Sequence, residues 1–331
     1  MSPEPSSGDD SRVLVAGETL IDFLPGNAGS LAAVETFERR AGGAPANVAV
    51  ALQRLDEPPT FWSRVGADQF GDFLVDRLAS VGLDTARVER DSSANTGLAF
   101  VAHDDDADRS FTFYRDGSAD TRLEPGTLAD ETLAAHDWVH AGGVTLADEP
   151  ARTATFDLTT RARAADCTVS FDPNARPELW DEFDFRESCL TAFDAADVVK
   201  LTPEDAAAAD LPTEPTTLAR AVADYGPHTV LVTMGGEGAA GYATAAAPWT
   251  DDGPVEVTHD GFTVDVVDTT GAGDAFTAGT IAALAGGESL DEALAFGNAV
   301  AAVTTTRTGA MTALPTRGDL TEVLDRVPPE N

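Results

Sequence analysis

The sequence predicts an α/β protein with a mostly parallel central sheet, helices on both of its faces and a small additional β-sheet. Two observations carry this prediction. Short apolar runs of strand length alternate with longer segments of helical spacing along most of the chain. Residues 96–114 break the alternation with two strand patterns in succession, which is typical of a hairpin. With 331 residues, 43% of them hydrophobic, the chain can form one large domain or two modest ones; we expect one, over residues 12–327.

The composition is strongly acidic. Acidic residues number 57 against 21 basic ones, the formal net charge is -36, and Lys200 is the only lysine. This charge argues against binding to nucleic acid or to an anionic membrane. It resembles that of halophilic proteins from a high-salt cytoplasm, where screening weakens self-repulsion. An ordinary acidic protein is the alternative.

The cysteines and the N-terminus bear on localisation. Cys167 and Cys189 lie in separate apolar segments without metal-ligand or disulfide spacing, which favours free thiols in a reducing compartment. No stretch has the ~18 apolar residues that a spanning helix needs. Residues 1–11 are polar and acidic, and we expect a disordered tail there, not a signal peptide. The expectation is a cytoplasmic protein.

The first strand is predicted at residues 12–17, an apolar run that ends in glycine. Asp22 follows among apolar neighbours at a strand end, where open α/β sheets bind ligands; a solvated turn aspartate is the alternative. Gly42 and Gly43 then precede an alanine-rich helix with Asn47 in its first turn. The glycines leave room for a ligand, and the asparagine offers a donor and an acceptor; tight packing at a helix start is the other explanation.

The hairpin is predicted from residues 96–102 and 110–114. Its acidic connection, residues 103–108, is interpreted as a solvated turn and not as a metal site. Arg115 follows the second strand and is placed to reach a ligand below the hairpin. Alternatively, it is a surface arginine that pairs with Asp116.

Strand–helix alternation surrounds the hairpin. Asp172, Asn174 and Arg176 fall at or beyond the end of one strand, on the edge where ligands bind. Residues 236–241 match G-x-G-x-x-G, but a strand and loop follow instead of the helix that a dinucleotide site needs, so we reject a dinucleotide site.

The predicted strands are 61–66, 138–144, 167–172, 197–201, 228–235 and 262–267, and the predicted helices are 68–81, 150–165, 275–284 and 290–306.

Residues 268–276, with the sequence DTTGAGDAF, are the most informative stretch. They join the predicted strand 262–267 to a helix N-terminus, where exposed backbone N–H groups suit an anion. Gly271 and Gly273 let the backbone approach that anion. Asp274, in the first helical turn, is placed to take a proton from a hydroxyl beside a phosphoryl group. A capped turn, in which the aspartate only complements the helix dipole, is the alternative.

This string resembles the C-terminal motif of the ribokinase/PfkB family of sugar kinases. Residues 41–49, AGGAPANVA, resemble the N-terminal motif of that family in its fructokinase form. Residues 172–180 resemble a stretch of fructokinases and of 2-keto-3-deoxygluconate kinases. The two family motifs stand in the right order, more than 200 residues apart, and a chance match of both is improbable.

The resemblance implies a ribokinase-like three-layer fold with a β-sheet lid over the sugar, from about residues 18–40 and 94–118. It implies ATP-dependent phosphorylation of a primary sugar hydroxyl, with Mg²⁺ and a monovalent cation such as K⁺. A homodimer through the lid is expected, because the family often uses the lid as its dimer contact. Fructose is the expected sugar and 2-keto-3-deoxygluconate its main rival. A nucleoside kinase and a non-catalytic sugar-binding regulator remain open.

Positions in the motifs imply roles for individual residues. Asp274 is the expected base, and Gly271, Ala272 and Gly273 are the expected anion hole. Asp205 is expected to reach Mg²⁺ through water, because this chain has Thr202 and Asp205 where the family usually has Asn-x-x-Glu. The expected sugar ligands are Asp22, Gly42, Gly43, Asn47, Phe100, Tyr114, Arg115, Asn174 and Arg176. The expected ATP contacts are Lys200, Thr202, Thr233, Gly235, Gly238 and Asn298. The candidate monovalent-cation site is Asp268, Thr270, Thr304, Arg307 and Gly309, with polar helix capping as the alternative.

Overall fold

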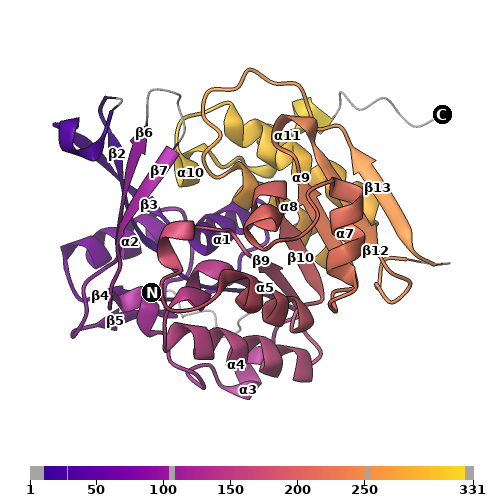
Figure 1. Ribbon diagram of the computed structural model, residues 1–331, viewed down its shortest axis with the longest axis horizontal. Helices are drawn as coiled ribbons and strands as arrows, with labels where there is room; N and C mark the ends of the chain where they lie inside the picture. The colour runs from indigo at the N-terminus through magenta and orange to yellow at the C-terminus, as the bar shows by residue number, and fades with distance from the viewer. Residues whose placement is uncertain (1–10, 28, 104–108, 251–252, 325–331) are drawn as a thin grey trace, which may run out of the picture.

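The computed structural model describes residues 11–27, 29–103, 109–250 and 253–324 (Figure 1). Its main sheet has nine strands in the order β13-β12-β11-β10-β9-β8-β1-β4-β5. The strands from β11 to β5 run parallel, whereas β12 and β13 are added antiparallel at one edge. The bounds are β1 Val13–Ala16, β4 Thr60–Gly66, β5 Val88–Asp91, β8 Trp138–Gly142, β9 Thr168–Asp172, β10 Val198–Leu201, β11 Thr229–Thr233, β12 Ala239–Ala243 and β13 Val255–His259.

Helices cover both faces of this sheet. Successive residues of a strand point to opposite faces, so Val13 and Val15 of β1 join one core and Leu14 and Ala16 join the other. The first core is shared with α1 Ala44–Arg54, α2 Gln69–Ser80, α8 Ala272–Ala285, α9 Leu290–Thr305, α10 Ala310–Ala313 and α11 Arg317–Leu324. The second is shared with α3 Asp130–Leu133, α4 Ala151–Ala164, α5 Phe185–Asp194, α6 Pro203–Ala208 and α7 Pro215–Ala223. The predicted fold class is confirmed.

A second sheet of four strands stands beside the main one, at the left of Figure 1, and we call it the lid. Its order is β3-β2-β6-β7, where β2 and β6 are parallel and the outer pairs are antiparallel. The bounds are β2 Leu20–Pro25, β3 Phe37–Gly42, β6 Leu98–His103 and β7 Arg109–Tyr114. Asp22 therefore lies inside a lid strand and not at the end of a main-sheet strand. Residues 1–10 of the predicted tail and residues 104–108 of the acidic hairpin connection lie outside the described residues.

The predicted strand at residues 262–267 is wrong. This segment has no sheet pairing, and the edge strand is β13, which precedes it. Alternating apolar residues suggested one buried face, yet Val266 and Val267 are each 61% exposed. After a turn at Gly261 (φ 74°) the chain leaves the sheet and crosses to α9, where Val267 N donates to Thr305 O at 2.8 Å. The DTTGAGDAF turn thus follows an irregular segment held by a helix.

Candidate active site

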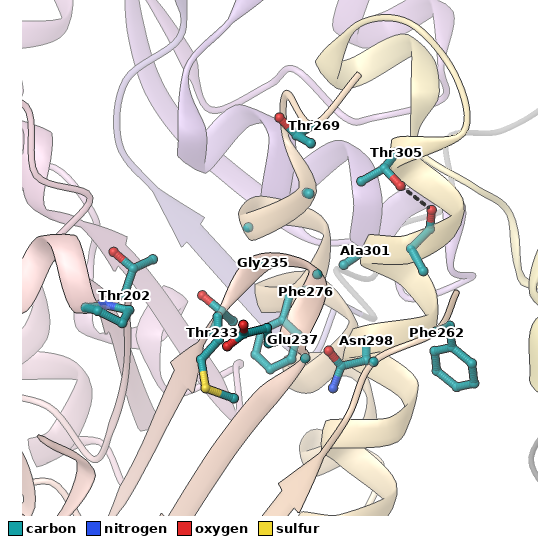
Figure 2. Close-up of a pocket in the computed structure, with 18 of the residues that line it drawn as sticks. Thr202, Thr233, Gly235, Glu237, Phe262, Thr269, Phe276, Asn298, Ala301 and Thr305 are labelled. Atoms are coloured by element: carbon teal, nitrogen blue, oxygen red, sulfur yellow. Dashed lines mark hydrogen bonds between the residues drawn. The ribbon is translucent and has the colours of Figure 1, made fainter. Parts of the chain in front are cut away.

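Two cavities meet at the N-terminus of α8. The larger, of about 680 Å³, lies between the 3-10 turn η5 (Gly235–Glu237), the segment after β13 and the helices α8 and α9 (Figure 2). The smaller, of about 340 Å³, lies between the end of β9 and the α8 turn. Lys200 and Gly273 line both cavities. A group that passed from one cavity to the other would therefore pass the amides of the α8 turn.

All six residues expected to contact ATP line the larger cavity. Figure 2 shows Thr233 and Gly235 below the turn and Asn298 across from them on α9. Phe262 and Phe276 add apolar walls of the kind that holds a planar ring. The expected residues that line it are Lys200, Thr202, Thr233, Gly235, Gly238 and Asn298.

Gly271 is the N-cap of α8 and takes the left-handed conformation, with φ 79°. Ala272 N donates back to Thr269 O at 3.2 Å, which tightens the turn. The first amides of a helix have no intrahelical acceptor, so this turn faces the junction of the cavities with N–H groups. A Cβ on Gly273 would lie 3.2 Å from Lys200 Nζ, so the glycine lets a cation approach the same place. This geometry suits an anion.

Asp274 is the third residue of α8 and lines the smaller cavity. Its Oδ2 accepts a hydrogen bond of 2.7 Å from Nδ2 of Asn47, which belongs to α1. Burial raises the pKa of Asp274 to about 7, although the hydrogen bond from Asn47 lowers it. A carboxylate with a pKa near neutrality is suited to act as a general base.

Lys200 at the end of β10 is buried and donates to Oδ2 of Asp172 at 3.0 Å. Burial disfavours its charge, but Asp172 and Asp205 more than compensate and raise the pKa of Lys200. The ammonium is therefore charged and lies where the two cavities meet. Asp172 was placed on the ligand-binding edge by the sequence analysis but was given no role, and its pairing with Lys200 was not expected.

Asp205 forms a capping box with Thr202 at the start of α6. Its Oδ2 accepts from Thr202 N at 2.8 Å, and its Oδ1 accepts from Ala175 N at 2.7 Å. Both oxygens thus have structural partners. The structure also has no group of three or more His, Cys, Asp or Glu side chains that could hold a metal, within the described residues.

Of the residues expected to contact the sugar, Asp22 lies in the lid, and Asn174 and Arg176 lie in the loop after β9. Burial raises the pKa of Asp22 to about 6, and the nearby Arg176 lowers it. The Arg176 guanidinium lies 5.3 Å from the ring centre of Phe111 in β7, so it bridges the body and the lid. Asn174 and Arg176 both line the smaller cavity. These contacts bring Asp22, Arg176 and Asp274 to one region.

Gly42 and Gly43 were expected to leave room for a ligand. In the structure the chain itself takes that room: a Cβ on Gly42 would lie 2.0 Å from Asp22 Oδ2, and one on Gly43 would lie 2.5 Å from Glu18 O. Gly43 also has φ 103°, which only glycine adopts readily. The two glycines therefore let β2 and the start of α1 pack together.

The expectation for Phe100 and Tyr114 needs correction. Phe23 pairs with Phe100 in the lid, and Asp22 pairs with Ala99, so Phe100 lies on the face opposite Asp22. Tyr114 lies on the same outer face, packs edge-on against Phe100 and is 64% exposed. The aromatic residues on the Asp22 face are Phe111 and Phe113. The alternation within β7 could have identified them once the register was known.

Arg115 is also placed differently from either expectation. It is 3% exposed and forms a short hydrogen bond with Asp120 and a 2.8 Å ion pair with Asp148, so it is not a surface arginine paired with Asp116. It does not line either of the two cavities.

The candidate cation residues are only partly brought together. Asp268 accepts from Thr270 N at 2.9 Å and, across the chain, from Gly309 N at 2.9 Å. Thr304 is fully buried and its hydroxyl donates to Val300 O within α9. Arg307 pairs with Asp319 of α11. In the structure, therefore, the Thr304 hydroxyl and the Arg307 guanidinium each have another partner, although the end of α9 lies beside the turn, where Asp268 N donates to Thr305 O at 3.1 Å.

Comparison with known proteins decides the family. The model of the pfkB family carbohydrate kinases matches residues 10–317. The chain belongs to this family. The "Probable fructokinase-6, chloroplastic" of Arabidopsis thaliana is 37% identical over 335 residues, which cover 98% of this chain and 85% of the plant protein. The recognition made from the two motifs is confirmed, and the protein is a carbohydrate kinase by family.

Solved kinase structures share the fold. The fructokinase with bound ATP from Xylella fastidiosa has a TM-score of 0.82 and 34% identity, and the match covers 95% of this chain and 98% of that one. A double mutant of the Vibrio cholerae O395 fructokinase, in a fructose, ADP and potassium ion bound form, has a TM-score of 0.79 and 31% identity. This match covers 95% of this chain and 98% of that one.

Within the described residues, no helix has the length and apolarity to cross a membrane.

Proposed function

We propose that this kinase is a fructokinase that transfers the terminal phosphoryl group of ATP to a primary hydroxyl of fructose. The observation that carries the proposal is the position of Asp274, which Asn47 holds on the wall of the smaller cavity, next to Gly273, which lines both cavities. The larger cavity has the size and lining for a nucleotide, and the smaller one has the polar groups for a sugar. The fructokinase relatives support the choice of activity.

In the proposed mechanism the acceptor hydroxyl of the sugar lies against Asp274. The carboxylate takes the hydroxyl proton as the oxygen attacks the phosphorus, and ADP leaves into the larger cavity. The amides of Gly271 and Gly273 and the ammonium of Lys200 stabilise charge on the transferring group, and the Ala272 amide, which donates to Thr269 O in the structure, would join them by turning to the phosphoryl group. Most of the catalysis would thus come from positioning and electrostatics.

The acidic groups fit Mg²⁺ only in part, because both oxygens of Asp205 already accept hydrogen bonds. The ion would be held by the nucleotide phosphates, and Asp205 would contact it through water. Bound there, Mg²⁺ neutralises charge on the phosphates. For a monovalent cation such as K⁺, Asp268, Thr270 and the Gly309 loop are the part of the expected site that the fold keeps together.

Charge favours fructose over 2-keto-3-deoxygluconate. The rival sugar carries a carboxylate, which needs a cation not already shared with other anions. Arg176 is the candidate cation, but it lowers the pKa of both Asp22 and Asp274, so its field is divided between two carboxylates. A neutral sugar avoids repulsion from these groups. Arg115, the other candidate, is buried in its own ion pairs.

The test is a coupled ADP-release assay of the purified protein in molar KCl, with a panel of sugars, sugar acids and nucleosides. We expect kcat/KM for fructose to exceed that for 2-keto-3-deoxygluconate by about tenfold or more, a difference of ~1.4 kcal/mol in transition-state binding. The reverse preference would reject fructose but keep the kinase. No ATP consumption with any substrate would favour a non-catalytic regulator.

We further propose a cytoplasmic homodimer that contacts its partner through the outer face of the lid. Phe23, Phe37, Phe100 and Tyr114 form an aromatic cluster there. Phe70 of α2 covers Phe23 from the body, whereas Tyr114 is exposed and available to a second copy. Light scattering after gel filtration should give a dimer for the wild type and a monomer for Tyr114→Asp.

The cytoplasmic location is supported by the cysteines, because Cys167 and Cys189 are buried free thiols, as expected in a reducing compartment.

A further inference from the structure

The four lid strands enter the body of the protein at one place. Register aligns Leu20 with Gly42, Ile21 with Leu98, and Leu98 with Tyr114, so the same end of every strand faces the body. We call this end the lid root. Any rotation of the lid relative to the main sheet must bend the chain here.

Buried charges gather at the lid root. Arg115 follows β7 directly and pairs with Asp120 and, at 2.8 Å, with Asp148. Gly97, just before β6, packs against the same group, because a Cβ on it would lie 2.7 Å from Asp120 Oδ1. Arg115 and Asp120 are 3% and 1% exposed. Arg115 therefore ties the ends of two lid strands to the body.

Glu18 occupies the other side of the root, just before β2. It is 2% exposed, and its Oε1 accepts a 3.1 Å hydrogen bond from Ala44 N, at the start of α1. Burial raises the pKa of Glu18 to about 7, and the charge of Arg115 lowers it. Glu18 thus interacts electrostatically with Arg115 and accepts a hydrogen bond from the first turn of α1.

The two side chains are incompletely satisfied. Glu18 Oε2 and Arg115 Nη2 are buried without a hydrogen-bond partner among the described residues, and no ion pair within 4.0 Å joins them. Unpartnered buried charges are costly, so an arrangement that brings these atoms together, directly or through a water, is favoured. A small movement of the lid root is the change that can do this.

The contact with α1 leads to the chemistry. Ala44 begins α1, and Asn47, in the same first turn, donates to Asp274 at 2.7 Å. A shift of this turn changes the direction of that hydrogen bond. The path from the lid root to the base therefore has one charge interaction without direct contact, between Arg115 and Glu18, and two hydrogen bonds, from Ala44 N to Glu18 and from Asn47 to Asp274.

We propose that Glu18 and Arg115 are positioning residues that couple the lid to the first turn of α1, so that sugar binding under the lid aligns Asn47 with Asp274. The proposal rests on the proposed function for its kinetic consequences. Neither residue touches the reacting groups; both act through α1 and the lid.

The kinetic test compares Arg115→Lys, Arg115→Met and Glu18→Gln with the wild type. Lysine keeps the charge but cannot pair with two carboxylates in the same way, and glutamine keeps an acceptor for Ala44 N but loses the charge. Arg90→Met is the matched control, because Arg90 pairs with the exposed Asp72 on the surface. We expect the KM for fructose to rise by about tenfold in Arg115→Met and Glu18→Gln, with partial rescue in Arg115→Lys, whereas the KM for ATP stays within about twofold.

A purely structural role would lower the yield of folded protein and leave the KM of the folded fraction unchanged, which would overturn the proposal. Equal rises in both KM values would also overturn it, because they would indicate general damage. Arg115→Met leaves Asp120 buried without its partner and is the variant most at risk of unfolding. Glu18→Gln and Arg115→Lys retain more of the buried interactions and keep the test available.

Amide hydrogen exchange supplies a readout that does not need activity. We expect the amides of residues 42–44, 46 and 47 to exchange faster in Arg115→Lys than in the wild type, although Arg115 lies more than 60 residues away in the chain. Arg90→Met should leave them unchanged. Unchanged exchange in Arg115→Lys would reject the coupling even in an active enzyme. If the wild type phosphorylates no sugar, the proposed function fails, while this measurement still decides the coupling.

Discussion

Lys200 Nζ lies 3.0 Å from Asp172 Oδ2, and both side chains are almost fully buried between the two cavities. The only lysine of the chain thus stands at the place where a phosphoryl group would pass. Its charge is kept by a carboxylate that faces away from solvent, so the pair is also part of the fold. Function and stability are therefore linked at this site.

This link can be tested with Lys200→Met. We expect the KM for ATP to rise and kcat to fall, and the variant to lose roughly 3–5 kcal/mol of unfolding free energy, because Asp172 is left buried and unpaired. Adding Asp172→Asn should restore part of the stability but none of the activity. Urea unfolding and steady-state kinetics on both variants check this; full stability of Lys200→Met alone would mean that the pair does not hold the fold.

Asp274→Asn should keep the binding of nucleotide and sugar and lower kcat by roughly 10²-fold or more, the scale for loss of a positioned base. The substitution preserves shape and can still accept from Asn47. Calorimetry with an ATP analogue checks that binding is kept, and turnover of fructose checks that kcat falls. A kcat within a few-fold of the wild type would remove Asp274 from the mechanism.

The same substitution should stabilise the protein above neutral pH. Burial raises the folded-state pKa of Asp274 to about 7, from 3.8. The folded state therefore binds the Asp274 proton more tightly than the unfolded state does. This protonation stabilises the fold fully below about pH 4, and the stabilisation is lost as the pH rises through 7. Asp274→Asn removes the cost of the buried charge, so at pH 8 its Tm should exceed that of the wild type. Near pH 4 the two should agree.

The pH–rate profile should rise through about pH 7 and then level off, because the base must be ionised. The pKa of Asp274 also responds to the charges of Lys200, Arg176 and Asp172. Asn47, however, is the group that donates a hydrogen bond to its carboxylate. Asn47→Ala should move the acid limb to higher pH, since the hydrogen bond that lowers the pKa is lost. The position of the limb is the measurement, not the height of the plateau. A limb that stays in place would separate Asn47 from the titration of the base.

The protein should need molar salt to stay folded, because a formal net charge of -36 is largely unopposed. Thermal melts from low to high KCl should show a steadily rising Tm. Equal ionic strength from NaCl gives the control for a specific effect of K⁺. A Tm that does not change across the series would show that the acidity has no stabilising link to salt.

Much of the site was accessible to sequence reasoning because it lies in contiguous motifs. The α8 turn, Asp274 and the six expected ATP contacts that line the larger cavity are set by local glycines, strand ends and helix starts. The wrong predictions concern residues whose surroundings depend on which strand or charged group they pair with. Phe100 was expected beside the sugar, yet strand register places it on the outer face of the lid, with Phe111 and Phe113 on the inner one.

By itself, the sequence determined the family, the strand–helix alternation and the candidate base, because these depend on short-range spacing of apolar residues and glycines. Only the tertiary structure decided what Asn47 touches: its partner, Asp274, is 227 residues away. It likewise decided that Arg115 is buried between carboxylates and that residues 262–267 leave the sheet. The physical reason is that burial, strand register and the pairing of charges arise only when distant segments pack together, and no local pattern encodes which partner each side chain meets.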